Sequence, residues 1–258
     1  MPNTKGKKRI RASERTLGIL DTLMKVNGAT GAEIAAKTGL PRSTVHYHLK
    51  TLEEFEYVVN VSRKYMPALK LLTIGHNRRA QMDLYNIAKP KVDYLAEETG
   101  EMCVLMYEEY GYGFYLYSNS GDKGVGFEAT GSRKNLHNNA LGKAILAYLP
   151  EQRVDSIIDS RGLPANTRHT VTSKNELVSQ LQEIRDRGIA IDREEQLDGL
   201  CCVAAPIKQH INDEQERVLG SISLAGPASR MVGEYLEDDL ANLVLDSANL
   251  IELEIQDY

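Results

Sequence analysis

The segment from residue 42 to residue 50, RSTVHYHLK, carries side chains that could read another molecule. If it is a helix, its exposed positions hold hydroxyl, imidazole, phenol and cationic groups. Such groups bind base edges and phosphate oxygens when their helix lies in the major groove of DNA. The predicted base-edge contacts are Arg42, Thr44, His46 and Tyr47. Ser43 suits a cap or a phosphate contact, Lys50 suits the DNA backbone, and a solvated helix face is the alternative.

A second set of residues could support catalysis or metal binding. His137, Asp192, Cys202 and Ser223 are the types found in nucleophile, base and acid arrangements. No strand-turn-helix nucleophile elbow, phosphate loop or HExxH accompanies them, so we predict no enzyme and no catalytic residue. A pocket metal held by His137, Asp192 and Cys202 stays open, but no ligand pair has diagnostic spacing. No cofactor is predicted. The acidic pair Glu194 and Glu195 is interpreted as a solvated loop.

The elements around residues 42–50 have the spacing of a helix-turn-helix. Two short helices, GAEIAAKTG and PRSTVHYHLKTLEEF, are separated by about three residues. Counted from Gly31 as position one, a small residue falls fifth, a glycine ninth and an apolar residue fifteenth, at Ala35, Gly39 and Val45. The predicted shared core is Ile34, Leu40, Val45, Leu49 and Leu52.

Charge separates this first part from the rest of the chain. Residues 1–75 carry 13 Lys and Arg against 6 Asp and Glu, a net charge of +7, while the remainder carries 18 against 30, or −12. A basic module beside an acidic remainder favours one phosphate-binding surface. It includes a basic arm with Lys5, Lys7, Lys8, Arg9 and Arg11. Arg63 and Lys64 lie in YVVNVSRKYMPALKLL, which predicts a two-stranded wing contacting DNA.

The rest of the chain predicts an α+β protein. SERTLGILDTLMKVNG predicts a helix capped by Ser13, with Leu17, Leu20, Leu23 and Met24 on one stripe. A helical stretch from Leu71 should end at Pro90, and MCVLMYEEYGYGFYLYSN predicts a hairpin whose tyrosines pack in a core or subunit surface. Further helices and three strands follow, which predicts an antiparallel sheet. The predicted domains are residues 1–75, a linker helix over 76–89, and residues 90–258.

Composition limits the class of protein. Apolar residues make up 42% and charged residues 26%, as in soluble globular proteins. The start lacks an apolar signal region, and no run approaches the roughly 18 apolar residues of a membrane span. The three cysteines, Cys103, Cys201 and Cys202, make a poor disulfide framework. We therefore predict a cytoplasmic protein with no membrane partner.

Three blocks resemble the IclR family of bacterial and archaeal regulators across nearly the whole chain. They are GAEIAAKTGLPRSTVHYHLKTLEEFEYV, GSRKNLHNNALGKAILAYLP, and GIAIDREEQLDGLCCVAAPI followed by SISLAGPASR. The resemblance implies a winged helix-turn-helix, a linker helix and a GAF-like effector domain. It also implies double-stranded DNA and a small organic acid or sugar-derived metabolite as partners, and a homodimer or dimer of dimers.

The family's effector pocket, carried over by position, implies six residues. They are the backbone amides of Ala140 and Leu141, the side chains of Asp192, Cys202 and Ser223, and the apolar wall Leu200. Ala225 stands where family members commonly have a second serine, and Tyr47 and His48 depart from the usual recognition helix. One alternative stays open, in which the second domain binds no ligand and only joins subunits.

Overall fold

The computed structural model describes residues 9–124, 130–212 and 215–256. The basic-arm residues Lys5, Lys7 and Lys8 lie outside these ranges. The chain forms two compact units that divide between Gln81 and Met82. Each unit has its own buried apolar core, so each is described by itself.

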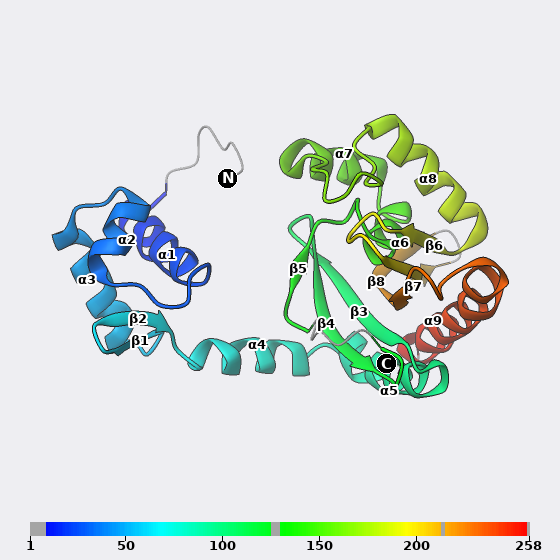
Figure 1. Ribbon diagram of the computed structural model, residues 1–258, viewed down its shortest axis with the longest axis horizontal. Helices are drawn as coiled ribbons and strands as arrows, with labels where there is room; N and C mark the ends of the chain where they lie inside the picture. Colours follow the sequence, from blue (N-terminus) through cyan, green and yellow to red (C-terminus); the bar gives the residue numbers. More distant parts are fainter. Residues whose placement is uncertain (1–8, 125–129, 213–214, 257–258) are drawn as a thin grey trace. The chain divides into compact units, whose positions relative to one another are not determined.

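The first unit is a three-helix bundle with a two-stranded wing, followed by a fourth helix (Figure 1). Its elements are α1 (Arg11–Leu23), α2 (Gly31–Thr38), α3 (Arg42–Glu54), β1 (Val58–Val61), β2 (Lys64–Pro67) and α4 (Lys70–Ala80). The winged helix-turn-helix predicted from the spacing is confirmed.

Helix α1 differs from its sequence prediction at its start and on its buried face. It begins at Arg11 after the N-cap Ile10, so Ser13 is not its cap. Ile19 and Leu23 are fully buried, whereas Leu17 and Met24 are 61% and 64% exposed. The predicted stripe was therefore wrong at both exposed positions, because α2 and α3 pack on the face that carries Ile19.

The turn between α2 and α3 follows from local capping. Thr30 and Glu33 form a capping box at the start of α2, where the Thr30 hydroxyl accepts from the Glu33 N–H. Gly39 ends the helix in the left-handed conformation, with φ at 70°, which glycine adopts without steric cost. Ile34, Val45, Leu49 and Leu52 are buried as predicted, and Leu40 packs against them.

Strands β1 and β2 form the wing by pairing antiparallel from Val58 opposite Pro67 to Val61 opposite Lys64. Ser62 and Arg63 form the tight turn, and both have positive φ, at 51° and 68°. This is the backbone of a two-residue hairpin turn. Arg63 and Lys64 thus lie at the exposed tip of the wing.

The predicted single linker helix over 76–89 is instead the end of one helix and the start of another. Helix α4 ends at Ala80 and α5 (Asp83–Thr99) follows. The predicted end at Pro90 was wrong, because α5 continues through that proline. Proline removes one N–H donor, but Leu84 and Ala88 before it and Val92 and Leu95 after it are buried. Packing of both halves holds the helix together.

The second unit is built on a six-stranded antiparallel sheet in the order β5-β4-β3-β8-β7-β6. The strands are β3 (Met102–Glu109), β4 (Tyr112–Ser120), β5 (Arg133–Lys134), β6 (Ala190–Arg193), β7 (Leu200–Asn212) and β8 (Gln215–Pro227). The predicted hairpin is β3 and β4, joined at Tyr110 and Gly111. These strands confirm the predicted α+β class.

Helices cover both faces of this sheet (Figure 1). One face packs on α5, the π-helix η1 (Tyr235–Asp239) and α9 (Leu240–Gln256). The other packs on α6 (Ala140–Ala147), α7 (Glu151–Arg161) and α8 (Lys174–Arg187). Adjacent residues on one strand therefore enter different cores: Cys201 lies among the α9 residues and Cys202 among the α6 residues.

Candidate DNA-reading helix and effector cavity

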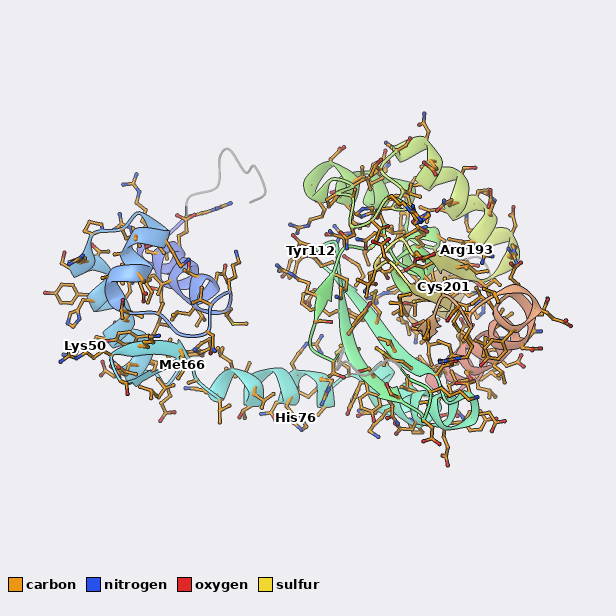
Figure 2. The ribbon with its side chains drawn as sticks, viewed as in Figure 1. Lys50, Met66, His76, Tyr112, Arg193 and Cys201 are labelled. Carbon is orange, nitrogen blue, oxygen red and sulfur yellow. The ribbon has the colours of Figure 1, made fainter. Side chains whose placement is uncertain are left out.

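Helix α3 presents a polar face away from the core of the first unit. Val45, Leu49 and Leu52 are buried, so at 100° per residue the positions opposite them are those of Ser43, Tyr47 and Lys50. Tyr47 is 70% exposed, and its ring meets that of His46 edge to face at 5.9 Å. Figure 2 shows the labelled Lys50 projecting from this helix.

The other predicted contacts of this helix flank that face. Arg42 and His46 are exposed, whereas Thr44 is half-buried. His48, on the same side as Thr44, meets α1: its Nδ1 lies 2.8 Å from the Thr16 hydroxyl, which itself donates to the Ala12 carbonyl at 3.0 Å. This contact joins α3 to α1, so His48 helps to position α3.

A small cavity in the second unit gathers residues from five separate segments. It is lined by Met102 and Val104 of β3, Tyr115 of β4, Asn139, Ala140 and Leu141 at the start of α6, Gln196 and Leu200, Cys202, and Ser223 and Ala225 of β8. Five of the six predicted effector residues are among them. The free volume is about 20 Å³, which is room for about one water molecule.

Three polar groups of the cavity residues are donors without a partner in the described part of the chain, whereas Asn139, Tyr115 and Gln196 are hydrogen-bonded through their side chains. The Asn139 side chain accepts from the Gly142 N–H at 2.8 Å, which caps α6. Among the residues that the structure describes, the N–H groups of Ala140 and Leu141 and the hydroxyl of Ser223 make no hydrogen bond. Ser223 is only 1% exposed. Free N–H groups at a helix start, beside a buried hydroxyl, suit a carboxylate.

Asp192, the sixth predicted residue, lies behind the cavity lining. It is fully buried and pairs across strands with Cys202. Its Oδ1 accepts from the Glu195 N–H at 2.7 Å, while Oδ2 has no partner in the described part of the chain. Burial, reinforced by the nearby Glu195 carboxylate, raises the pKa of Asp192 to about 7. The side chain is therefore poised between its neutral and charged forms near neutral pH.

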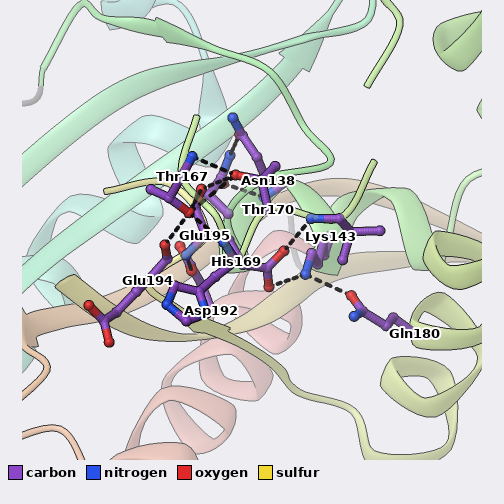
Figure 3. A network of polar contacts seen from close by, with 12 residues as sticks. Asn138, Lys143, Thr167, His169, Thr170, Gln180, Asp192, Glu194 and Glu195 are labelled. Atoms are coloured by element: carbon purple, nitrogen blue, oxygen red, sulfur yellow. Dashed lines mark hydrogen bonds and ion pairs between the residues drawn. The ribbon is translucent and has the colours of Figure 1, made fainter. Parts of the chain in front are cut away.

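Glu195 is not the solvated residue that the sequence suggested. It is 7% exposed and forms an ion pair with Lys143 of α6, which is 1% exposed. Figure 3 shows the Lys143 ammonium reaching both Glu195 and Gln180 of α8, the latter at 2.7 Å. Thr170 donates to the Glu195 carbonyl at 2.7 Å. Two segments distant in sequence thus hold this acidic loop against the sheet.

The geometry does not support a catalytic or metal-binding role for the set His137, Asp192, Cys202 and Ser223. The Nε2 of His137 lies 3.1 Å from the Pro164 carbonyl, and burial lowers the pKa of its imidazole. Burial also raises the pKa of the Cys202 thiol well above its usual value. In the described ranges no side-chain hydrogen bond joins any two of the four residues. No group of three or more His, Cys, Asp or Glu there could hold a metal ion.

Sequence reasoning missed part of the cavity wall. Met102, Val104 and Asn139 carried no signal beyond ordinary strand and cap residues, and Gln196 stood in a loop with no pattern. Tyr115 was one of five tyrosines in the hairpin, and only the fold separates it from the others. No helix in the described part of the chain is long and apolar enough to cross a membrane.

Comparison with protein families matches both units. Residues 12–62 match the IclR helix-turn-helix domain, and residues 76–253 match the domain described as bacterial transcriptional regulator IclR C-terminal. The chain belongs to the IclR family. As members of this family are transcription regulators, this IclR-family chain is a DNA-binding regulator with a C-terminal effector-binding domain, and not an enzyme.

Curated relatives extend the match over the whole length. The HTH-type transcriptional regulator XynR of Escherichia coli is 30% identical over 86% of this chain and 88% of the relative. The probable HTH-type transcriptional regulator ArcR of Halobacterium salinarum is 28% identical over 96% of this chain and 95% of the relative.

Solved IclR structures share the fold. The IclR protein of Thermotoga maritima, 26% identical, superposes with a TM-score of 0.73 over 96% of this chain and 99% of that one. An IclR homologue of Microbacterium hydrocarbonoxydans, crystallised with 4-hydroxybenzoate, is 20% identical with a TM-score of 0.77 over 95% and 98%. The latter likeness concerns the fold alone.

Proposed function

We propose that this IclR-family regulator changes its affinity for a DNA operator when a small carboxylate binds in the cavity of the second unit. The observation that carries the proposal is the cavity's donor set: two free N–H groups of α6 and the buried Ser223 hydroxyl. Aromatic or sugar-derived acids fit its mixed apolar and polar wall. The proposed effector contacts are Ala140, Leu141, Leu200, Cys202 and Ser223, with Asp192 supporting them from behind.

The cavity must enlarge to admit such a ligand, since its free volume is about 20 Å³. If the chain with the enlarged cavity and the chain with the closed cavity bind the operator with different affinities, ligand binding changes the operator affinity by linkage. The sign of that change follows from which form binds DNA better.

An effector that binds the folded chain should raise its melting temperature in proportion to occupancy. We would screen small acids, including 4-hydroxybenzoate and sugar acids, by thermal shift and by operator affinity. Ser223→Ala should weaken the binding of an acid found in this screen by about 1.5 to 3 kcal/mol, as expected for a hydrogen bond to a charged group. Ser160→Ala, on α7 outside the cavity, is the matched control. If a broad panel produced neither a thermal shift nor an affinity change, the second domain would be an oligomerisation module instead.

For the DNA contacts, we propose that Arg42, Ser43, Thr44, His46, Tyr47 and Lys50 face the major groove and that Arg63 and Lys64 of the wing contact the backbone. The exposed face of α3 and the exposed wing tip support this assignment. Arg42→Ala should weaken operator binding by about 1 to 3 kcal/mol if Arg42 reads a guanine. An equal loss on operator and random duplex would mark a phosphate contact.

We further propose that the chain acts as a homodimer or dimer of dimers in the cytoplasm. Helix α4 supports self-association, because none of its residues is buried within the chain. Leu69, which precedes it, is 80% exposed and Leu72 is 70% exposed. Two α3 helices of a dimer could then enter successive major grooves about 34 Å apart. Analytical ultracentrifugation of the full chain, with Leu72→Lys as the disrupting variant, tests this.

A further inference from the structure

One hydrogen bond closes the cavity between two segments that are far apart in sequence. The Tyr115 hydroxyl of β4 donates to Oε1 of Gln196 at 3.1 Å. Both residues line the cavity, and Tyr115 is 5% exposed. In the sheet, β4 lies on one side of β3 and β8, and Gln196 belongs to the loop that leads into β7 on the other side. The bond therefore spans the two strands that supply Met102, Val104, Ser223 and Ala225.

A bulge in β4 turns Tyr115 toward this cavity. Met106 pairs with Tyr115 but Leu105 pairs with Tyr117, so Leu116 is an extra residue between them. Tyr115 consequently joins the core under α6, while Tyr117 packs with the core under α5 and donates to Asp93 at 2.8 Å. Two tyrosines two positions apart thus lie on opposite faces of the sheet.

The loop Glu194–Gly199 is anchored at both ends, and its middle residues have fewer contacts with the rest of the unit. At the base, Lys143 pairs with the Glu195 carboxylate, and Thr167 and Thr170 donate to the carbonyls of Glu194 and Glu195 at 2.7 Å. At the other end, the Gly199 N–H donates to the Glu194 carboxylate at 2.7 Å and the Gly199 carbonyl accepts from the Ala228 N–H at 2.8 Å. Between the ends, at the tip, Gln196 is bound by Tyr115 and, at 3.3 Å, by the Asn166 side chain. Leu197 is 54% exposed, and Gly199 has φ at 79°. The Tyr115 hydroxyl is therefore the side-chain contact that ties the middle of the loop to the opposite side of the cavity.

We infer that the hydrogen bond between Tyr115 and Gln196 is a latch that controls entry to the cavity. Breaking it frees the tip of the loop, separates the two sides of the cavity and exposes its lining, including Cys202. Tyr115 and Gln196 are positioning residues in this role. The latch as an effector gate rests on the proposed function, but its control of access to Cys202 does not.

The test measures alkylation of Cys202 in the full chain with no ligand added. N-ethylmaleimide would be applied for increasing times, and the modified cysteines located by tandem mass spectrometry. Cys202 is 8% exposed and reacts through opening of the cavity, so its rate follows the opening equilibrium. Tyr115→Phe and, separately, Gln196→Ala should each raise the Cys202 rate about two- to tenfold, the effect of losing one buried hydrogen bond.

Two controls separate opening of the latch from loss of stability. Cys103 is fully buried in the opposite core, so its alkylation reports global unfolding. Each latch variant also loses its hydrogen bond on unfolding and can accelerate Cys103 by the same factor, so the two absolute rates are compared, and Cys202 should react faster than Cys103 in every variant. Tyr117→Phe removes a tyrosine hydroxyl from the same strand on the other face, and should leave the Cys202 rate unchanged. The latch is overturned if neither variant accelerates Cys202, or if Cys202 reacts no faster than Cys103, which would mean that it is reached only by global unfolding. Failure of the acid screen with accelerated Cys202 would refute the effector proposal and leave the latch standing.

Discussion

Replacing Lys143 with methionine should destabilise the second unit more than any surface substitution would. Lys143 is 1% exposed, and its ammonium binds the carboxylate of Glu195 and the Gln180 side chain. Lys143→Met keeps most of the volume but leaves the Glu195 carboxylate buried with little beyond a 3.5 Å contact from the Val171 N–H. Breaking one partner of a buried pair costs about 3 to 5 kcal/mol of unfolding free energy.

Urea unfolding of the full chain, followed by far-UV circular dichroism, measures this loss. With a slope of about 2 kcal/mol per molar urea, the midpoint for the second unit should fall by about 2 M. Lys174→Met is the matched control, because Lys174 pairs with Asp155 at 2.7 Å with both side chains half exposed. It should cost about 0 to 1 kcal/mol.

The reasoning from burial would be refuted if the two lysine variants lost the same stability within about 0.5 kcal/mol. A double variant, Lys143→Met with Glu195→Gln, adds a second check. Removing the orphaned charge should recover part of the loss, since two residues in contact do not behave additively.

Asp192→Asn should reduce the dependence of the unfolding free energy on pH. Burial raises the pKa of Asp192 to about 7 in the folded chain, so unfolding releases its proton between about pH 4 and 7. The stability of the wild type therefore falls as pH rises through that window. Denaturation midpoints at pH 5 and pH 8 check this, and a variant as pH-dependent as the wild type would exclude Asp192 as the cause. Gly142→Ala should cost about 3 kcal/mol or more, because a Cβ there would lie 2.1 Å from the Leu136 carbonyl oxygen. Gly18 lies on α1, where an added Cβ would meet no atom within 4 Å, so Gly18→Ala should instead stabilise the chain by about 0.5 to 1 kcal/mol. Thermal melts of both glycine variants test this contrast. Tyr47→Ala should leave the melting temperature nearly unchanged, since Tyr47 is 70% exposed, and should weaken operator binding measured by fluorescence anisotropy. If the variant bound the operator as tightly as the wild type, Tyr47 would not be a DNA contact.

The amino-acid sequence determined the elements whose signals are local. Gly39 ends α2, and the apolar spacing of Ile34, Val45 and Leu49 forms the helix-turn-helix core, because capping and helical periodicity act within one or two turns. Five of the eleven residues that line the cavity were also predictable, through resemblance to a family rather than through chemistry visible in the residues.

Tertiary structure decided the rest, for reasons that no local pattern contains. Leu17 looked buried and is exposed, because which face of α1 is covered depends on where α2 and α3 pack. Glu195 looked solvated and is buried, because its partner Lys143 comes from a helix 52 residues earlier in the chain. The one-residue bulge at Leu116 places Tyr115 and Tyr117, two positions apart, on opposite faces of the sheet. Strand register and the packing of distant segments therefore set which side chains line the cavity, and these are properties of the assembled sheet.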